Sequence, residues 1–310
     1  MNTEAYSHTK AQHLHTQRHH NHSHAQNSQH SGGHHLLQIE NLSLGFRMYD
    51  PEARGFFQAP HIKQKLIDTL SLSVHVGEIL ALVGASGSGK TLLADSLMAL
   101  FEPNVEVCGS IYFDGVLQDA ASLAKLRGNG ISFVPQSTMH LDPLMRVGKQ
   151  VCGFSGDRRA REKKRKKLFE RYELDESLAK LYPFELSGGM ARRVLLVSAL
   201  MDEPRLIIAD EPTPGLDLEL AVKAMDDFRK FADEGRGVLL ITHDIELALK
   251  VADRIAVFSA GSVVEETAVH NFSSPDLLNH PFSKKLWHAL PEHDFLVLED
   301  QNASEEGTLC

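Results

Sequence analysis

Cysteine is scarce in this chain of 310 residues, which holds only Cys108, Cys152 and Cys310, scattered along the sequence. So few and so scattered cysteines argue against a framework of disulfide bonds and fit a protein of a reducing compartment. Long apolar runs are also missing. The longest, Val194 to Met201, is less than half of the roughly 20 residues that a helix needs to span a bilayer. Any membrane attachment is therefore expected to come from other proteins.

Positive charge is not in excess either, because the net charge is −9. This balance gives no general reason to expect a nucleic acid as partner. The first residues are polar and have no apolar stretch, so we expect no secretory signal.

Residues 1–35 contain ten of the eighteen histidines and almost no apolar side chains. Such a segment cannot bury enough surface to offset its ordering entropy, and we expect it to be disordered. Neutral imidazoles at this density can chelate Ni²⁺, Zn²⁺ or Cu²⁺. A solvated tail and a cloning remnant are the alternatives, although interspersed histidines are not typical of a purification tag.

From Leu36 on, the pattern predicts strands that alternate with helices. The expected strands are 36–40, 42–46, 66–76, 79–83, 110–113, 131–134, 205–211 and 238–242, with a hairpin at 255–265. The expected helices are 92–101, one through the basic run 158–167, 190–201, one after 244, and 282–289, and the expected loops include 47–62 and 141–151. This spacing predicts an α/β fold with a largely parallel sheet and an antiparallel group before it.

One stretch reads G-x-x-x-x-G-K-T, the phosphate-binding loop, between a short apolar strand and a helix. Its members are Gly84, Ala85, Ser86, Gly87, Ser88, Gly89, Lys90 and Thr91. The glycines let backbone N–H groups turn toward an anion, and the following helix points its N-terminus at the same place. Lys90 supplies a full charge to the terminal phosphates and the Thr91 hydroxyl is a ligand for Mg²⁺.

A second apolar strand ends in Asp210 and Glu211. Asp210 can hold Mg²⁺ through water, because this ion prefers hard oxygen ligands and keeps several waters. Glu211 stands one residue further on, where a carboxylate can polarise a water for attack on the γ-phosphate. Together with the upstream loop, this pair predicts a site that binds and hydrolyses a nucleoside triphosphate.

Several further motifs resemble those of the ATP-binding cassette (ABC) ATPases, in the order of that family. They are Gln136 as the Q-loop glutamine, Ser187-Gly188-Gly189 as the signature, Pro214-Gly215-Leu216-Asp217 as the D-loop, His243 as the switch histidine, and Phe46 as the aromatic that stacks on adenine. The resemblance covers roughly residues 36–270. It implies a phosphate-loop ATPase fold with a RecA-like parallel core, an antiparallel β subdomain and a helical signature subdomain at about 137–200.

The resemblance also implies a role for each of these site residues. Gln136, His243 and Glu211 would be catalytic, with Gln136 joining Thr91 and Asp210 around Mg²⁺. The signature residues Ser187, Gly188 and Gly189 and the D-loop Asp217 would complete the ATP site of a second cassette, so that two cassettes sandwich two ATPs. The helical subdomain would receive the membrane subunits.

Within the family, the chain most resembles the ATPases of peptide and nickel importers. The pointers are Met190 after the signature, Leu141-Asp142-Pro143 with Val147-Gly148-Lys149-Gln150, and the C-terminal run from His280 to Leu286 with Ala289-Leu290-Pro291, which makes 271–310 an extension of that subfamily. There are departures: Ala191-Arg192-Arg193 replaces the usual Arg-Gln-Arg, Pro214-Gly215 replaces smaller residues, and a C-terminal cysteine cluster is absent from the sequence.

The first hypothesis is therefore the ATP-hydrolysing subunit of an importer at the cytoplasmic face of a membrane. Its partners would be two permease subunits, a second ATPase, identical or paralogous, and a periplasmic or lipid-anchored solute-binding protein. The cargo would be a peptide, nickel or a metal chelate, and the histidine-rich tail tilts the choice toward nickel. The alternatives are a soluble cassette protein that acts on nucleic acid or ribosomes, for which the basic run is the support, and a metal buffer.

Overall fold

The computed structural model describes residues 34–49, 61–85, 87–101 and 104–290, all within one unit of the chain. The acidic C-terminal end and the predicted disordered tail lie outside these residues, apart from His34 and His35, and His35 is the first residue of a strand. Ser86 of the phosphate-binding loop also lies outside the described residues. Among the described residues, no helix has the length and apolar character needed to cross a bilayer.

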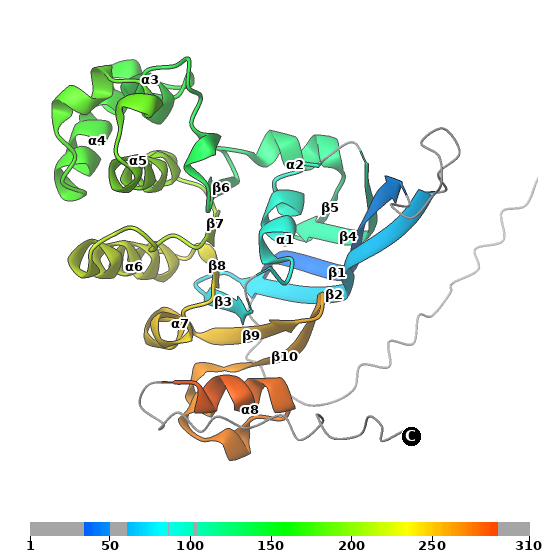
Figure 1. Ribbon diagram of the computed structural model, residues 1–310. Coiled ribbons are helices and arrows are strands. Elements are labelled where there is room, and N and C mark those ends of the chain that lie inside the picture. Colours follow the sequence, from blue (N-terminus) through cyan, green and yellow to red (C-terminus); the bar gives the residue numbers. More distant parts are fainter. Residues whose placement is uncertain (1–33, 50–60, 86, 102–103, 291–310) are drawn as a thin grey trace, which may run out of the picture. The chain divides into compact units, whose positions relative to one another are not determined.

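A six-stranded sheet forms the core, with the strand order β10-β9-β3-β8-β7-β6 (Figure 1). The strands are β3 (Ile79–Gly84), β6 (Ile131–Val134), β7 (Leu206–Asp210), β8 (Gly237–Thr242), β9 (Arg254–Ser259) and β10 (Ser262–Ala268). All neighbours are parallel except β9 and β10, which form the predicted hairpin. β3, β7 and β8 are buried along their whole length, as expected for parallel strands covered on both faces.

Successive side chains of β3 point into two different cores. Ile79, Ala81 and Val83 join a cluster with the helices α5 (Gly188–Met201), α6 (Leu218–Asp233) and α7 (Ile245–Val251). Leu80 and Leu82 join a second cluster with α1 (Lys90–Leu97) and the antiparallel sheet. This alternation fixes β3 in register, because a slip by one residue would exchange the two faces.

The antiparallel sheet has the order β2-β1-β4-β5, with β1 (His35–Tyr49), β2 (His61–His75), β4 (Val105–Phe113) and β5 (Val116–Gln118). The predicted α/β fold with an antiparallel group is confirmed. The strands predicted at 36–40 and 42–46 are one strand, whose register shifts between Ile39 and Leu42. Asn41 has a φ of 51° there, so the backbone kinks and the strand continues.

Three predictions of local structure were wrong in part. The expected loop at 47–62 is shorter, because β1 continues to Tyr49 and β2 begins at His61. Residues 141–151 are not all loop, because α3 (Val147–Cys152) forms within them, and the helix expected at 92–101 ends at Leu97. Two helices, α2 (Ala120–Leu126) and α6, were not predicted at all.

Tertiary contacts explain why the local sequence does not predict helix α3. No side chain caps its N-terminus, and instead the Val147 N–H donates to Leu181 O at 2.9 Å. Gly148 allows a close approach, because a Cβ there would lie 2.8 Å from the Ala179 Cβ. Val147 and Val151 are buried in the core, so packing, not helix propensity, makes this helix.

The basic run lies on α4 (Arg158–Arg171) and is largely paired with carboxylates. Arg161 contacts Asp202 at 2.8 Å, and Arg165 forms a two-pronged pair with Glu176 at 2.6 and 3.0 Å. Phe169 and Tyr172 at the end of this helix are buried in the core, and the Arg165 guanidinium lies over the Phe169 ring, 4.9 Å from its centroid. These contacts agree with the ordinary explanation of the run, a solvated helix face crossed by ion pairs.

A buried carboxylate ties the C-terminal helix α8 (Pro281–His288) to β10. Glu265 accepts hydrogen bonds from the N–H groups of Asn279 at 2.8 Å and His280 at 2.9 Å. Burial alone would raise the pKa of Glu265, but the hydrogen bonds from Asn279 and His280 outweigh it and lower that pKa. The carboxylate form therefore stabilises the fold above the pKa of an unfolded glutamate, and this contribution disappears as pH falls through the lowered value.

Replacing Glu265 by alanine is expected to lower the free energy of unfolding at pH 7 by about 1–3 kcal/mol, because two backbone N–H groups lose a charged acceptor. Urea denaturation measures the change, and limited proteolysis should cut residues 269–290 faster. Glu234→Ala, at an exposed carboxylate, serves as the control. Equal stability of both variants would contradict the anchoring role.

Candidate functional site

The carboxyl ends of β3, β7 and β8 converge on one cavity of about 290 Å³. It is lined by Gly87, Gly89, Lys90, Thr91, Gln136, Asp210, Glu211 and His243. In the sequence these residues span more than 150 positions, and the crossovers of the parallel sheet bring them together. β3 lies between β8 and β9, where the strand order reverses, and such a switch point is where ligands bind in open α/β sheets.

The phosphate-binding loop follows β3 and leads directly into α1. Gly87 and Gly89 have φ values of 74° and 106°, which glycine adopts without strain. The buried Lys90 donates from Nζ to Gly84 O at 2.9 Å and to Ala85 O at 2.8 Å. Burial lowers the pKa of Lys90, while the nearby Glu211 and Asp210 oppose that shift. The loop thus holds a desolvated cation at the N-terminus of a helix, an arrangement that suits a polyphosphate.

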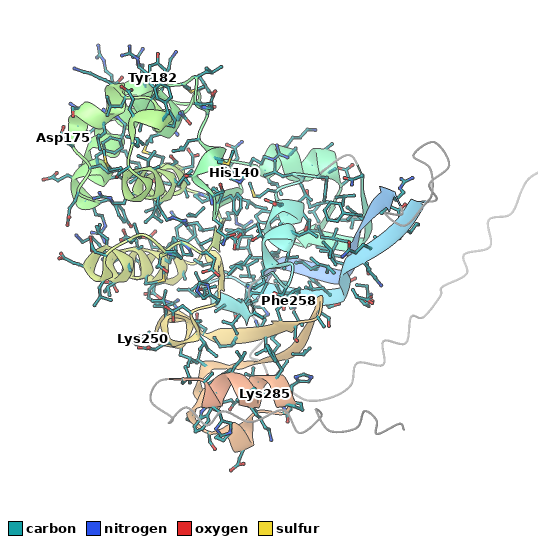
Figure 2. The ribbon with its side chains drawn as sticks, in the orientation of Figure 1. His140, Asp175, Tyr182, Lys250, Phe258 and Lys285 are labelled. Atoms are coloured by element: carbon teal, nitrogen blue, oxygen red, sulfur yellow. The ribbon has the colours of Figure 1, made fainter. Side chains whose placement is uncertain are left out.

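Gly84 has no room for a side chain, because a Cβ there would lie 2.2 Å from the carbonyl oxygen of Phe258 on β9. Phe258 is labelled in Figure 2. Gly84→Ala is therefore expected to separate β3 from β9 and to lower the free energy of unfolding by about 2 kcal/mol or more. Thermal denaturation checks this. Gly188→Ala is the matched control for stability, because a Cβ there meets nothing within 4 Å. A Gly84→Ala variant as stable as that control would show that the two strands adjust without cost.

Asp210 is 1% exposed and its Oδ2 has no hydrogen-bond partner. Burial raises the pKa of Asp210 to about 6, helped by Glu211 and Asp95 and opposed by Thr91 and Lys90. Thr91 Oγ1 donates to Gln136 Oε1 at 3.3 Å close by. An unpartnered buried carboxylate oxygen beside a hydroxyl and an amide oxygen is a hard-oxygen set, which fits Mg²⁺.

Glu211 is held by the end of β8. Its Oε1 accepts from the backbone N–H of His243 at 2.9 Å and lies 2.7 Å from His243 Nδ1, and its Oε2 accepts from Thr242 Oγ1 at 3.2 Å. Glu211 is 6% exposed, whereas the His243 side chain is 57% exposed. A buried carboxylate in contact with an imidazole at the cavity wall is a suitable acceptor for the proton of a water molecule.

The other predicted site residues lie outside this cavity. Ser187 and Asp217 are exposed, and each caps a helix, with Ser187 Oγ accepting from Met190 N at 3.3 Å and Asp217 Oδ1 from Leu220 N at 2.9 Å. Gly188 is exposed and Gly189 is partly exposed at the start of α5. Phe46 is half-buried on β1, opposite Gln64 and Val105. Their roles in nucleotide binding stay predictions.

Two contacts of Glu211 were not predicted. The sequence predicts Thr242 only as the last residue of a strand, and Arg192 only as a departure from the usual pattern. Arg192 Nη1 donates to the backbone oxygen of Glu211 at 2.9 Å, across 19 positions of sequence. The departure from the family pattern at Arg192 was the one sequence feature that pointed to this contact, although the neighbouring residues do not show what the arginine binds.

This fold and this cavity define a phosphate-loop ATPase with two carboxylates at the end of β7. The chain belongs to the ABC transporter family, whose sequence profile matches residues 67–214. It is 33% identical over 270 residues to the oligopeptide transport ATP-binding protein OppD of Lactococcus lactis subsp. cremoris strain SK11, covering 83% of this chain and 76% of that protein. The OppD of Bacillus subtilis strain 168 is 33% identical over 273 residues, covering 83% and 72%.

Solved structures agree with this assignment. A dimeric ATP-binding cassette in a post-hydrolysis state, bound to ADP and Pi, superimposes with a TM-score of 0.63 at 29% identity, and the match covers 75% of this chain and 98% of that one. The predicted fold class is confirmed, and the chain is an ATPase of the ABC type.

Proposed function

We propose that this chain is the ATP-hydrolysing subunit of an ABC importer that takes up peptides. The observation that carries the proposal is the cavity, where loop, carboxylates, glutamine and histidine meet in a chain that is 33% identical to oligopeptide transport ATP-binding proteins over most of both lengths. A nucleic-acid function is not favoured, because the basic residues of α4 are largely paired.

The residues of the cavity divide the chemistry among them. The backbone N–H groups of the loop and Lys90 bind and orient the phosphates. Glu211 receives the proton of the attacking water, and His243, which touches that carboxylate, orients the γ-phosphate and the water. Electrostatic positioning of this kind supplies most of the catalysis in phosphoryl transfer.

Thr91, Asp210 and Gln136 would hold Mg²⁺. The ion, when bound, neutralises charge on the phosphate oxygens. The unpartnered Oδ2 of Asp210 supports this assignment. The raised pKa of Asp210 also supports a bound cation, because the cation would replace the solvation that burial removes from the carboxylate.

We place the chain in a dimer of cassettes, because Ser187 and Gly188 are exposed on the signature end and do not line the cavity. Two permease subunits would dock on the helical part, and a solute-binding protein would deliver the cargo outside. Large apolar side chains are exposed on that part, with Met139 at 90%, Leu144 at 87% and Phe184 at 74%. Tyr182 stacks on Phe184 at 5.6 Å (Figure 2). Large apolar side chains at the surface are typical of interaction surfaces, so these three support docking on membrane subunits and a peripheral place on the cytoplasmic face of a membrane.

Nickel as the cargo stays an alternative that rests on the histidine-rich tail. The two relatives named above carry oligopeptide transport in their names. Peptide is therefore the preferred substrate class.

The test of this function is uptake by cells that lack the chain. Cells with the gene deleted are expected to lose uptake of labelled oligopeptides and to regain it with the wild-type gene but not with Lys90→Ala. Uptake of ⁶³Ni²⁺ measured in the same cells separates the two cargoes. Loss of nickel uptake alone, rescued by the wild-type gene, would overturn the peptide assignment.

A further inference from the structure

Arg192 joins the signature helix to the backbone of the catalytic carboxylate. It lies one turn into α5 and is half-buried, and its Nη1 donates to Glu211 O at 2.9 Å. This hydrogen bond goes to a backbone oxygen and not to the carboxylate of Asp210 or Glu211. The guanidinium therefore acts on the peptide that follows Glu211, and its charge is directed at a carbonyl dipole.

That peptide is in an unusual conformation. Glu211 has a φ of 48°, in the left-handed region, which costs a residue with a Cβ roughly 1–2 kcal/mol. Three contacts hold it there: the Glu211 N–H donates to Ile241 O at 2.8 Å, the side chain is bound by Thr242 and His243, and the carbonyl is bound by Arg192. Without the third contact, the peptide after Glu211 could rotate and re-aim the carboxylate.

The same helix also touches the far end of the segment that follows Glu211. A Cβ on Gly189 would lie 3.2 Å from Gly215 O, so the start of α5 packs closely on this segment. α5 thus contacts both Glu211 and Gly215 from a single rigid element. A shift of its exposed N-terminus would move the guanidinium that fixes the Glu211 peptide.

We propose that Arg192 is a positioning residue for ATP hydrolysis, which holds the left-handed peptide of Glu211 and couples the aim of that carboxylate to the position of α5. The inference rests on the ATPase part of the proposed function and not on the transported substrate. Loss of nucleotide binding is not expected when Arg192 is changed, because the residue does not line the cavity. The turnover rate is expected to fall instead.

The test compares steady-state ATP hydrolysis by purified full-length variants. Arg192→Met keeps the length of the side chain and removes the donor, and kcat is expected to fall about 10- to 30-fold with KM for ATP within about twofold, as for a misplaced catalytic group. Arg192→Lys, which keeps a charged donor, is expected to recover most of that loss. Arg193→Met is the matched control on the same helix, because Arg193 donates to the backbone oxygens of Tyr172, Glu173 and Gly189 and not to that of Glu211.

A double variant shows whether Arg192 acts through Glu211. In a Glu211→Gln background, single-turnover hydrolysis is expected to change less than about threefold on adding Arg192→Met, because the carboxylate that it positions is already gone. A wild-type kcat in Arg192→Met would overturn the proposal. An equal loss in Arg193→Met, or the full 10- to 30-fold loss in the Glu211→Gln background, would overturn it too. Wild-type protein that hydrolyses ATP but restores no peptide uptake would refute the transport function and leave this comparison intact.

Discussion

Glu211→Gln is expected to lower the rate of ATP hydrolysis by roughly 100- to 1000-fold while ATP still binds. The amide keeps the shape of the side chain and an oxygen for the N–H of His243, but it cannot take a proton from water. The loop that binds the phosphates is unchanged, so ATP should accumulate in a closed dimer. Release of phosphate measures hydrolysis, and size-exclusion chromatography with ATP measures the dimer.

Glu234→Gln controls for the loss of one negative charge, because that carboxylate is 62% exposed and lies outside the cavity. Its hydrolysis rate should match that of the wild type. Hydrolysis at the wild-type rate by Glu211→Gln would show that another group takes the proton, and His243 would be the next candidate.

Asp210→Asn is expected to have two opposite effects. Hydrolysis should fall at least about 100-fold, because the carboxylate proposed to hold Mg²⁺ is lost. The protein without nucleotide or Mg²⁺ should become more stable at pH 7.5, by an amount on the order of 1–3 kcal/mol, because a buried, ionised carboxylate is removed. A catalytic group that destabilises its own fold is typical of a functional site.

The pH dependence follows from the direction of the shift. The pKa of Asp210 is raised from 3.8 to about 6 in the folded chain, so the folded state binds more protons than the unfolded state between these values. Stability therefore falls as pH rises from about 4 to 6, and the full penalty is present above that window. Urea denaturation at pH 4 and 7.5 should show a larger gain for Asp210→Asn at 7.5, with the exposed Asp226→Asn as the control. An equal gain at both pH values would contradict the shift.

The parts of the site that the sequence could predict are those whose function needs a local pattern. The loop from Gly84 to Thr91 needs glycines at fixed spacing, and Asp210 and Glu211 must follow a buried strand. Gln136 and His243 were predicted only through resemblance, because a single glutamine or histidine after a strand has many uses. The parallel strand order that gathers all of them follows from the alternation of strands and helices.

The parts that could not be predicted depend on distant contacts. Helix α3 is made by the packing of Val147 and Val151 and by a bond to Leu181, none of which its own residues reveal. The left-handed conformation of Glu211 has no local signal, because glutamate rarely adopts it and glycine is the usual residue there. Arg192 reaches Glu211 only because α5 packs beside the end of β7.

The exposed start of α5, at Ser187 and Gly188, affects how the rate of ATP hydrolysis depends on the concentration of the protein. If a second chain must supply this surface to the cavity, the rate depends on encounter, and the specific activity should rise with protein concentration until dimers predominate. A chain that forms a homodimer shows this rise in specific activity without any added partner. A chain that needs a paralogue stays slow at every concentration until that partner is added, so a dilution series distinguishes an identical second cassette from a different one.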